Sequence, residues 1–578
     1  MYNLSEKKLY KPFSNDLEKV EVISYLKKIL IQESSLITIA ATYGVIIALL
    51  SLAVPISVQF LINSVSFTAT TQPIIFLGIT LFLFLGFWSL LNILRFYVTE
   101  IFQRKFFARM TSEVGLSLLN AEYKTFETAN QTEMVNRFFE TTNIQKSIPK
   151  ILTKTFAIAL QTIAGLILVS FYHPIFLVFS LFAGTSVFLI WILYYKKALK
   201  SAFYESRRKY DIVGWLEDIA RGHLSFKSKA GHDYAKYKIN FLTGLYLEER
   251  KQHFKSLFSQ TILLLALYVV SSISLLMIGG LLVLKGQLTI GQLAAAELVL
   301  STSLYGISQF GKDFESFYDL IASCEKLSQF QNIPSDRKNG LKLPSENINI
   351  KFKDVFFRNN SNSYLLNIDI TYNKSYAILS EGFSTKKLIL DMMLGFTKPE
   401  QGSIQLNGVN LKDFDLYEYR SEISLIDNSP LIEASIKEYL TLGSETISDA
   451  EINNILTAVK LDEHILQLQD GILSRIIPSG WPFSQTEKIL LKIARALLRK
   501  TEIIILTEVF DSIAPKIRNT VFEYINNHTQ TTLIYFTNRE NDLENFDQYI
   551  VIKNNSSKLF NSKEELLEFK EKSSENEQ

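Results

Sequence analysis

Cysteine is nearly missing from this sequence, and so is any excess of charge. Its 578 residues include one cysteine, Cys324, so an internal disulfide framework and a multi-cysteine metal site are excluded. The formal net charge is only +2, which gives no reason to expect a nucleic-acid partner. The first 34 residues are polar and lack a short apolar core before a cleavage site, so we expect no cleavable signal peptide.

Charged residues are absent from three long stretches: Glu33 to Arg95, Lys154 to Lys196, and Lys255 to Lys285. Each of the first two stretches is long enough for two membrane spans of about 20 residues. The third holds one span, and the run LTIGQLAAAELVLSTSLYGISQF after Gly286 supplies a sixth. With 47% hydrophobic residues and a mean hydropathy of +0.13, the sequence predicts an integral membrane protein with six transmembrane helices.

Basic residues predict how these spans are oriented. The loops Arg95 to Lys154 and Lys196 to Lys255 carry 9 and 14 Lys and Arg residues, whereas the short connections on the opposite side carry only Lys285. By the positive-inside rule both long loops, and therefore both termini, are expected on the cytoplasmic side.

A soluble domain is predicted after the sixth span. The segment QNIPSDRKNGLKLPSEN has the composition of a linker. Beyond it, apolar runs such as SYAILS, EIIILT and TTLIYF alternate with helical stretches, which is typical of an α/β domain. We therefore expect a lead-in at 1–34, a helical membrane domain at 35–328, a linker at 329–346, an α/β domain at 347–565 and a charged tail at 566–578.

Several stretches in a fixed order resemble one family. KTFETANQTEMVNRFFET resembles the first intracellular loop of ABC exporters, and KGQLTIGQLAAAELV resembles the start of their sixth span, especially in the branch that secretes proteins and peptides. LGFTKPEQGSIQLNGVNLKDFDLYEYRSEISLI and IARALLRKTEIIIL resemble two parts of their nucleotide-binding domain. Together these stretches indicate an ABC exporter half-transporter.

This resemblance implies a fold and a set of partners. Six spans would be fused to an α/β P-loop-type nucleotide-binding domain, and two such chains, as a homodimer or a heterodimer, would form the working unit in a lipid bilayer. It implies ATP and Mg²⁺ as cofactors, a bacterial plasma (inner) membrane as the location, and a periplasmic adaptor protein as a further partner. Short helices within Tyr123 to Met134 and within Ile212 to Arg221 would dock on nucleotide-binding domains.

The phosphate-binding loop departs from the family pattern. A loop of this type reads G-x-x-x-x-G-K-[ST], and its glycines let backbone N–H groups close around phosphate oxygens. In YAILSEGFSTKKLILDMMLG the pattern lysine is Lys386, Ser380 and Thr385 replace both glycines, and Ser384 precedes Thr385. A positive φ would strain the β-branched Thr385. Lys387 replaces the hydroxyl that holds Mg²⁺, and a second cation repels a metal.

The remaining departures lie at positions to which the resemblance assigns roles. They are Asn359 at the adenine-stacking position, Asn428 with Asp427 near the glutamine that senses γ-phosphate and Mg²⁺, Ser484 as the surviving serine of the signature, Thr507 at the Mg²⁺-linked aspartate, Glu508 at the general base and Asn538 at the switch histidine. No Mg²⁺ is expected, since Lys387, Asn428 and Thr507 occupy its usual positions. Phosphoryl transfer depends on positioning and charge neutralisation, so we expect weak ATP binding at best and an idle Glu508.

Three functions are compatible with this pattern. The first is an exporter subunit that moves an unknown substrate out of the cytoplasm, with impaired or absent ATP hydrolysis in its own domain. The second is a pseudo-ATPase that regulates or scaffolds another complex, and the third is an active homodimeric exporter with divergent motifs. Glu297, about halfway along the sixth span, either contacts the substrate or a proton or is a hydrogen-bonded carboxylate inside the helix bundle.

Overall fold

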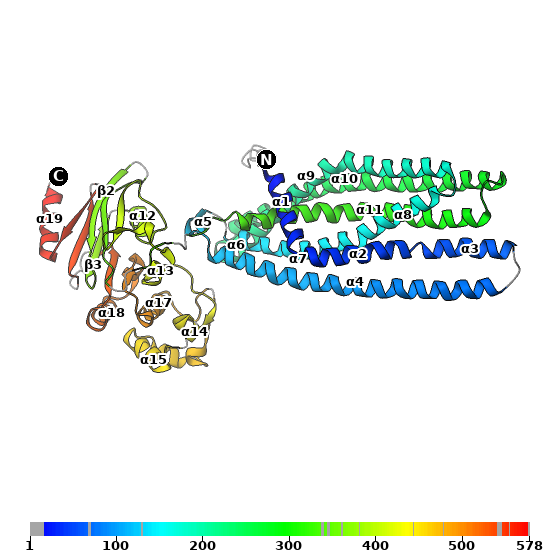
Figure 1. Cartoon of the computed structure of the whole chain (residues 1–578). Helices are drawn as coiled ribbons and strands as arrows, with labels where there is room; N and C mark the ends of the chain where they lie inside the picture. Colours follow the sequence, from blue (N-terminus) through cyan, green and yellow to red (C-terminus); the bar gives the residue numbers. More distant parts are fainter. Residues whose placement is uncertain are drawn as a thin grey trace. The chain divides into compact units, whose positions relative to one another are not determined.

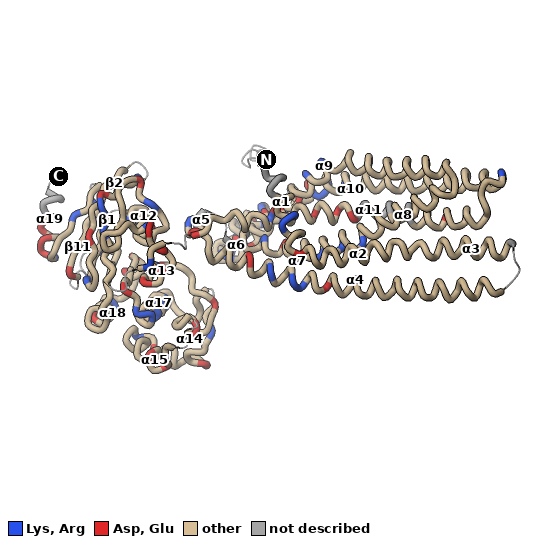
Figure 2. The backbone as a smooth tube through the Cα atoms, in the orientation of Figure 1, with Lys and Arg blue, Asp and Glu red and all other residues tan. Residues whose placement is uncertain are grey.

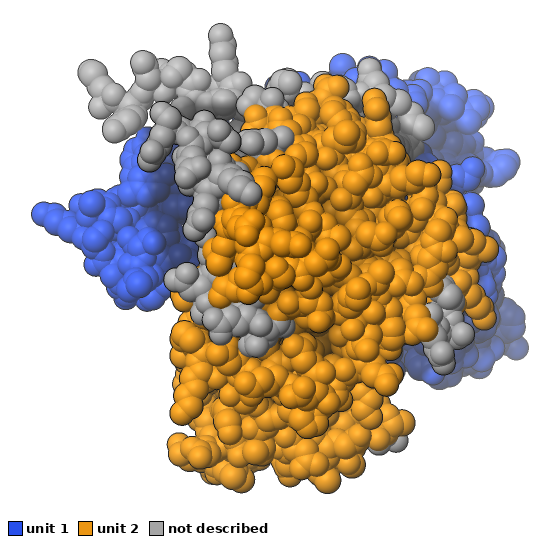
Figure 3. All heavy atoms as spheres, turned by 90° about the vertical axis from the view of Figure 1, so that its left-hand side faces the viewer, with its two compact units in different colours: residues 1–335 blue, residues 336–578 orange. Residues whose placement is uncertain are grey.

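The computed structural model divides into two compact units, Met1–Ser335 and Asp336–Gln578 (Figure 3). The structure describes residues 17–575 except for short gaps at 68–70, 129–130, 337–339, 344–346, 360–361, 381, 443, 445, 478, 540–545 and 554. The boundary at Ser335 falls inside the segment whose composition is that of a linker.

The first unit is helical throughout its described part (Figure 1). Its helices are α1 (Leu17–Gln32), α2 (Ser34–Leu50), α3 (Ala53–Phe67), α4 (Gln72–Leu119), α5 (Tyr123–Thr128), α6 (Gln131–Asn136), α7 (Glu140–Pro149), α8 (Phe156–Ser170), α9 (Pro174–Arg221), α10 (Lys229–Leu284) and α11 (Ile290–Gln331), with short η2 (Arg137–Phe139), η3 (Lys150–Thr155) and η4 (His223–Phe226).

Five helical stretches among the described residues are long and apolar enough to cross a membrane. They are Ser34–Ser66, Gln72–Leu119, Met134–Ser170, Pro174–Arg221 and Lys229–Leu284. The sixth predicted span coincides with the start of α11, whose apolar part Ile290–Thr302 is shorter. Charged residues are concentrated at the end of this unit that carries α1, α5 and α6, and they are almost absent from the end that carries α3 (Figure 2).

Helix starts in the first unit follow local capping chemistry. His173 has an extended backbone, its ring accepts a hydrogen bond from the Ile175 N–H, and Pro174 begins α9. Thr289 and Gln292 form a capping box at the start of α11, directly after Gly286 with φ of 68°. The connection before α9 therefore turns at His173–Pro174, and the connection before α11 turns at Gly286.

One expectation for the cytoplasmic loops is wrong. The segment Ile212 to Arg221 is not a separate short helix but the end of α9, and the chain reverses only at Gly222–Ser228. Trp215 is buried there against Phe226 and lies 3.8 Å from the Lys238 ammonium. The sequence signal for this helix end is Arg221 in the last turn followed by Gly222, which the expectation of a separate short helix did not use.

The second unit contains one ten-stranded sheet with the order β5-β4-β1-β2-β12-β11-β3-β10-β9-β6. Its strands are β1 (Ile350–Asn359), β2 (Asn362–Ile370), β3 (Ser375–Ser380), β4 (Gln401–Leu406), β5 (Val409–Asn410), β6 (Ile423–Ile426), β9 (Ile503–Leu506), β10 (Thr532–Thr537), β11 (Gln548–Lys553) and β12 (Ser556–Phe560), and a separate pair joins β7 (Ala434–Ser435) to β8 (Arg475–Ile476). Strands β11, β3, β10, β9 and β6 are parallel neighbours.

The parallel strands are buried on both faces, as their continuous apolar runs predict. The accompanying helices are α12 (Phe383–Met393), α13 (Leu416–Ser421), α14 (Ile436–Thr441), α15 (Asp449–Ala458), α16 (Asp462–Gln467), α17 (Gln485–Arg499), α18 (Pro515–His528) and α19 (Lys563–Glu575), with short η5 (Leu411–Asp413), η6 (Gly471–Leu473) and η7 (Glu508–Ser512). One hydrophobic core cluster packs the helices from α14 through α18 against the sheet. A second includes residues of β1, β2 and α12.

Candidate functional site

The candidate site lies at the carboxyl ends of the parallel strands of the second unit. Helix α12 follows β3, the segment Thr507–Glu508 follows β9, and Asn538 follows β10. Ligands of open α/β sheets bind at this edge. Three separate parts of the sequence therefore meet where the phosphate loop is expected.

Lys386 lies at the centre of this edge and is bonded within the chain. Its side chain is 5% exposed, and its ammonium donates to the Asn538 Oδ1 and lies 3.8 Å from a Glu508 carboxylate oxygen. Burial lowers the pKa of Lys386, and the carboxylates of Glu508 and Asp511 oppose that shift. The structure thus brings the pattern lysine, the general-base position and the switch position together, with their polar groups directed at one another.

The loop before Lys386 is short. Only Glu381, outside the described residues, and Gly382 separate β3 from α12, and Ser380 is buried as the last residue of β3. The positive φ falls on Gly382, at 85°, whereas Thr385 is buried with helical backbone in the first turn of α12. Thr385 therefore causes no backbone strain, contrary to the concern that the glycine pattern raises.

Asn359 contacts the same turn. Its amide donates to the Ser384 Oγ at 2.9 Å and to the Thr385 Oγ1 at 3.1 Å. Thr385 in turn donates to the Tyr364 hydroxyl at 3.3 Å. The residue at the adenine-stacking position is a hydrogen-bonding partner of the loop and offers no aromatic face.

The expected Mg²⁺ positions are also occupied by contacts within the chain. Lys387 pairs with Asp391 at 3.1 Å, and the Thr507 hydroxyl donates to the Ile426 carbonyl at 2.9 Å. Asn428 accepts a hydrogen bond from Gln485 at 2.8 Å. Among the described residues no group of three potential ligands gathers to hold a metal ion.

Ser484 begins α17 as its N-cap. Its Oγ accepts a hydrogen bond from the Glu487 N–H, and the Glu487 carboxylate accepts one from the Ser484 N–H at 2.8 Å. The other carboxylate oxygen lies 2.7 Å from the His464 Nδ1. Burial raises the pKa of Glu487, but the Ser484 hydrogen bonds and His464 outweigh it and lower that pKa. The Glu487 carboxylate therefore takes part in the capping box at the start of α17, where the family's signature is expected.

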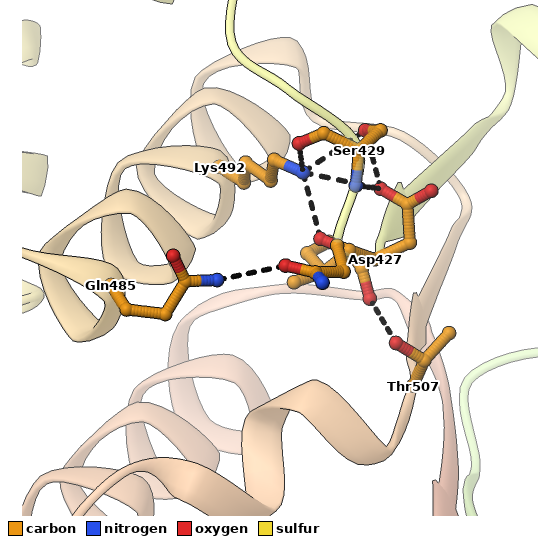
Figure 4. A network of polar contacts seen from close by, with 7 residues as sticks. Asp427, Ser429, Gln485, Lys492 and Thr507 are labelled. Carbon is orange, nitrogen blue, oxygen red and sulfur yellow. Dashed lines mark hydrogen bonds and ion pairs between the residues drawn. The ribbon is translucent and has the colours of Figure 1, made fainter. Parts of the chain in front are cut away.

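Two further charged residues hold this region: Asp511, which stands where the resemblance expects the start of S-A-L-D, and Lys492, which was not singled out from the sequence. Asp511 accepts hydrogen bonds from the hydroxyls of Tyr535 and Thr537 and from the Asn538 N–H, and so fixes the end of β10. Lys492 on α17 is buried against Asp427 and Ser429, as Figure 4 shows. The signal for Lys492 is its place on the apolar face of α17, three residues after Ile489 and four before Ala496.

Two family models match the chain. The ABC transporter transmembrane region matches residues 37–305, and the ABC transporter model matches residues 366–511. The chain belongs to the ABC transporters. The two matches lie one in each compact unit, so the ABC transmembrane region is fused to an ABC nucleotide-binding domain, and the predicted fold class is confirmed.

Individual ABC transporters are similar over parts of the chain. ATP-dependent permease MDL1 of Candida albicans is 28% identical over 49% of this chain and 43% of that protein. The Lactococcin-A transport/processing ATP-binding protein LcnC of Lactococcus lactis subsp. lactis is 24% identical over 66% of this chain and 54% of that protein. Alpha-hemolysin translocation ATP-binding protein HlyB of Escherichia coli O157:H7 is 24% identical over 57% of this chain and 46% of that protein. The chain spans about half or less of the length of these curated relatives.

The exporter fold extends over nearly the whole chain. A bacterial Atm1-family ABC exporter, solved with ATP bound, superimposes with a TM-score of 0.78 and covers 94% of this chain and 97% of its own. Its sequence is 16% identical, so the likeness shows the fold alone.

ABC nucleotide-binding domains bind ATP, usually with Mg²⁺, and the residues of this domain can be tested for that fit. They do not fit the family's Mg²⁺ site, because the cation Lys387 stands at the hydroxyl position and Thr507 stands at the carboxylate position. Lys386, at the lysine position of the phosphate-binding pattern, is buried beside Glu508 and Asn538.

Proposed function

We propose that this chain is a subunit of an ABC exporter whose own nucleotide-binding domain binds ATP weakly and does not hydrolyse it. The subunit resides in a bacterial inner membrane with both termini in the cytoplasm, and it works as a dimer with itself or with another half-transporter. It moves its substrate out of the cytoplasm. The names of LcnC and HlyB, which describe transport of lactococcin and translocation of alpha-hemolysin, support protein or peptide export. A periplasmic adaptor protein is proposed as a further partner.

The proposal that this domain does not hydrolyse ATP, called the idle-domain proposal, is supported most by the contacts of Lys386. A lysine that binds phosphate needs its ammonium free to meet the ligand, whereas this one is buried beside Glu508 and Asn538. Phosphoryl transfer also needs a metal ion, and here a cation, Lys387, stands at the hydroxyl position and Thr507 lacks the carboxylate that the family uses.

Restoring the family residues tests this proposal. The five substitutions Thr385→Gly, Lys387→Ser, Thr507→Asp, Gln485→Gly and Thr486→Gly should give measurable ATP hydrolysis only in combination, because one reaction needs metal, loop and signature together. The purified chain carrying each change alone should stay at background. Adding Glu508→Gln to the combined variant is the matched control and should remove the regained activity. Hydrolysis gained from a single substitution would show that the native domain is close to active, and the proposal would fail.

A further inference from the structure

Lys492 is a buried lysine whose ammonium is surrounded by oxygen atoms from one short segment. It donates to the Asp427 carbonyl at 2.7 Å, the Asp427 Oδ1 at 3.2 Å, the Ser429 carbonyl at 2.6 Å and the Ser429 Oγ at 3.0 Å (Figure 4). Its side chain is 5% exposed. Two carbonyls, a carboxylate and a hydroxyl form the kind of oxygen cage that a bound cation requires.

The segment Asp427–Ser429 is also held from its other sides. The Ser429 N–H and hydroxyl both donate to the Asp427 Oδ1, at 3.1 and 2.6 Å, and Gln485 donates to Asn428. Just before the segment, the Ile426 carbonyl accepts from Thr507 at 2.9 Å. The segment thus has a defined conformation in which α17, β6 and the end of β9 are joined by contacts within one chain.

Because the Lys492 ammonium is buried, the conformation of Asp427–Ser429 depends on its positive charge. An ammonium removed from water is costly unless oxygen ligands replace its hydration, and here four such contacts do so. The reverse also holds, since without the ammonium the Asp427 and Ser429 carbonyls would lose this donor and the Asp427 carboxylate would keep only its Ser429 contacts. The cation and the segment therefore depend on each other.

We propose that Lys492 is a positioning residue that acts as a built-in cation: it holds Asp427–Ser429 on α17 in one conformation, whether or not nucleotide is present. The same segment includes the position at which the family senses γ-phosphate and Mg²⁺. This inference rests on the proposed function. A sensing segment that is fixed by its own chain cannot report the nucleotide state to the rest of the exporter.

Amide hydrogen exchange of the full-length chain in lipid nanodiscs tests the inference, with the Ser429 amide as the probe. In the wild-type chain this amide should exchange slowly, and addition of ATP and Mg²⁺ should leave its rate unchanged. Lys492→Ala should accelerate the exchange about tenfold or more, because local opening no longer breaks the ammonium contacts. Lys488→Ala is the matched control, one turn earlier on α17 with its ammonium on the Ser479 carbonyl, and should leave the rate at the wild-type value.

Chemical rescue separates a cation role from simple packing. A cavity of about 190 Å³ lies beside the network and is lined by Asp427, Ser429 and Lys492. Methylammonium chloride should therefore slow the exchange of Lys492→Ala, and tetramethylammonium chloride at the same ionic strength should not. If Lys492→Ala does not fold, Ser429→Ala, which removes one of the four oxygens, should accelerate exchange of the Asn428 amide in a folded chain.

Three results would overturn the inference: a wild-type exchange rate that changes with nucleotide, a Lys492→Ala rate equal to that of the control, or rescue by both amines alike. ATP hydrolysis measured on the same samples distinguishes a failure of the Lys492 inference from a failure of the idle-domain proposal. Hydrolysis by a chain whose Ser429 exchange ignores nucleotide would refute the idle-domain proposal and leave the built-in cation in place.

Discussion

At the scale of single residues, polar groups of the candidate nucleotide site contact one another within the chain. Lys386 faces Glu508 and Asn538, and Lys492 contacts the oxygens of Asp427 and Ser429. The replaced glycines are read from the sequence position by position against a known pattern, whereas the loss of the metal stays a prediction. The partners that satisfy Lys386 and Lys492 could not be predicted from the sequence, because they come from strands far apart in the sequence.

The Asp427 contacts predict how stability depends on pH. Burial raises the pKa of Asp427, but the Ser429 hydrogen bonds and the Lys492 charge outweigh it and hold that pKa below its usual range. A carboxylate with a depressed folded-state pKa stabilises the fold above its unfolded-state pKa of about 3.9 and loses that contribution as pH falls through the folded value.

Thermal unfolding of the second unit should show this loss. The melting temperature of the wild-type chain should exceed that of Asp427→Asn at pH 6, and the difference should shrink as the pH falls below about 4. Asp470→Asn, at an exposed carboxylate, serves as the control and should differ from wild type by a constant amount. A difference for Asp427→Asn that is the same at both pH values would contradict the assigned contacts.

At the scale of elements, the membrane helices follow from charge and the cytoplasmic connections do not. The charge-free stretches predict the helices because burying a charge in lipid is costly, and the turns at His173 and Gly286 follow from capping chemistry. Helix α9 ends at Arg221, directly before Gly222, and the contacts of Trp215 with Phe226 and Lys238 form across the reversal that follows.

Cysteine crosslinking tests which connections meet a nucleotide-binding domain. Since Gly222–Ser228 forms the reversal after α9, Leu224, which is 86% exposed there, is the probe for this connection. Leu224→Cys or Phe126→Cys should crosslink in native membranes to exposed positions within 391–439, such as Ile432→Cys, on the same or the partner chain.

Two features give these crosslinks their controls. Cys324 is buried, so the wild-type chain should give no background. Trp215→Cys, at a buried position, should crosslink far less than Leu224→Cys. A thorough set of exposed pairs without any crosslink would count against a conventional exporter arrangement.

At the scale of the whole molecule, the chain has the ABC exporter fold, and we propose that its nucleotide site is idle. Both halves of a composite ABC site depart from the family pattern in this one chain, the phosphate-loop half at Lys387 and the signature half at Gln485 and Glu487. On this proposal a homodimer would contain no intact site, and pairing with an intact partner would spoil both composite sites.

The most direct test of this account is the rate of ATP hydrolysis by the purified homodimer, measured for the wild-type chain and for Glu508→Gln. The account predicts no hydrolysis above background in either sample, because Glu508 is paired with Lys386 and no cluster of three metal-binding side chains forms among the described residues. An easily measured wild-type rate that falls about tenfold or more in Glu508→Gln would show an active general base and would contradict the account.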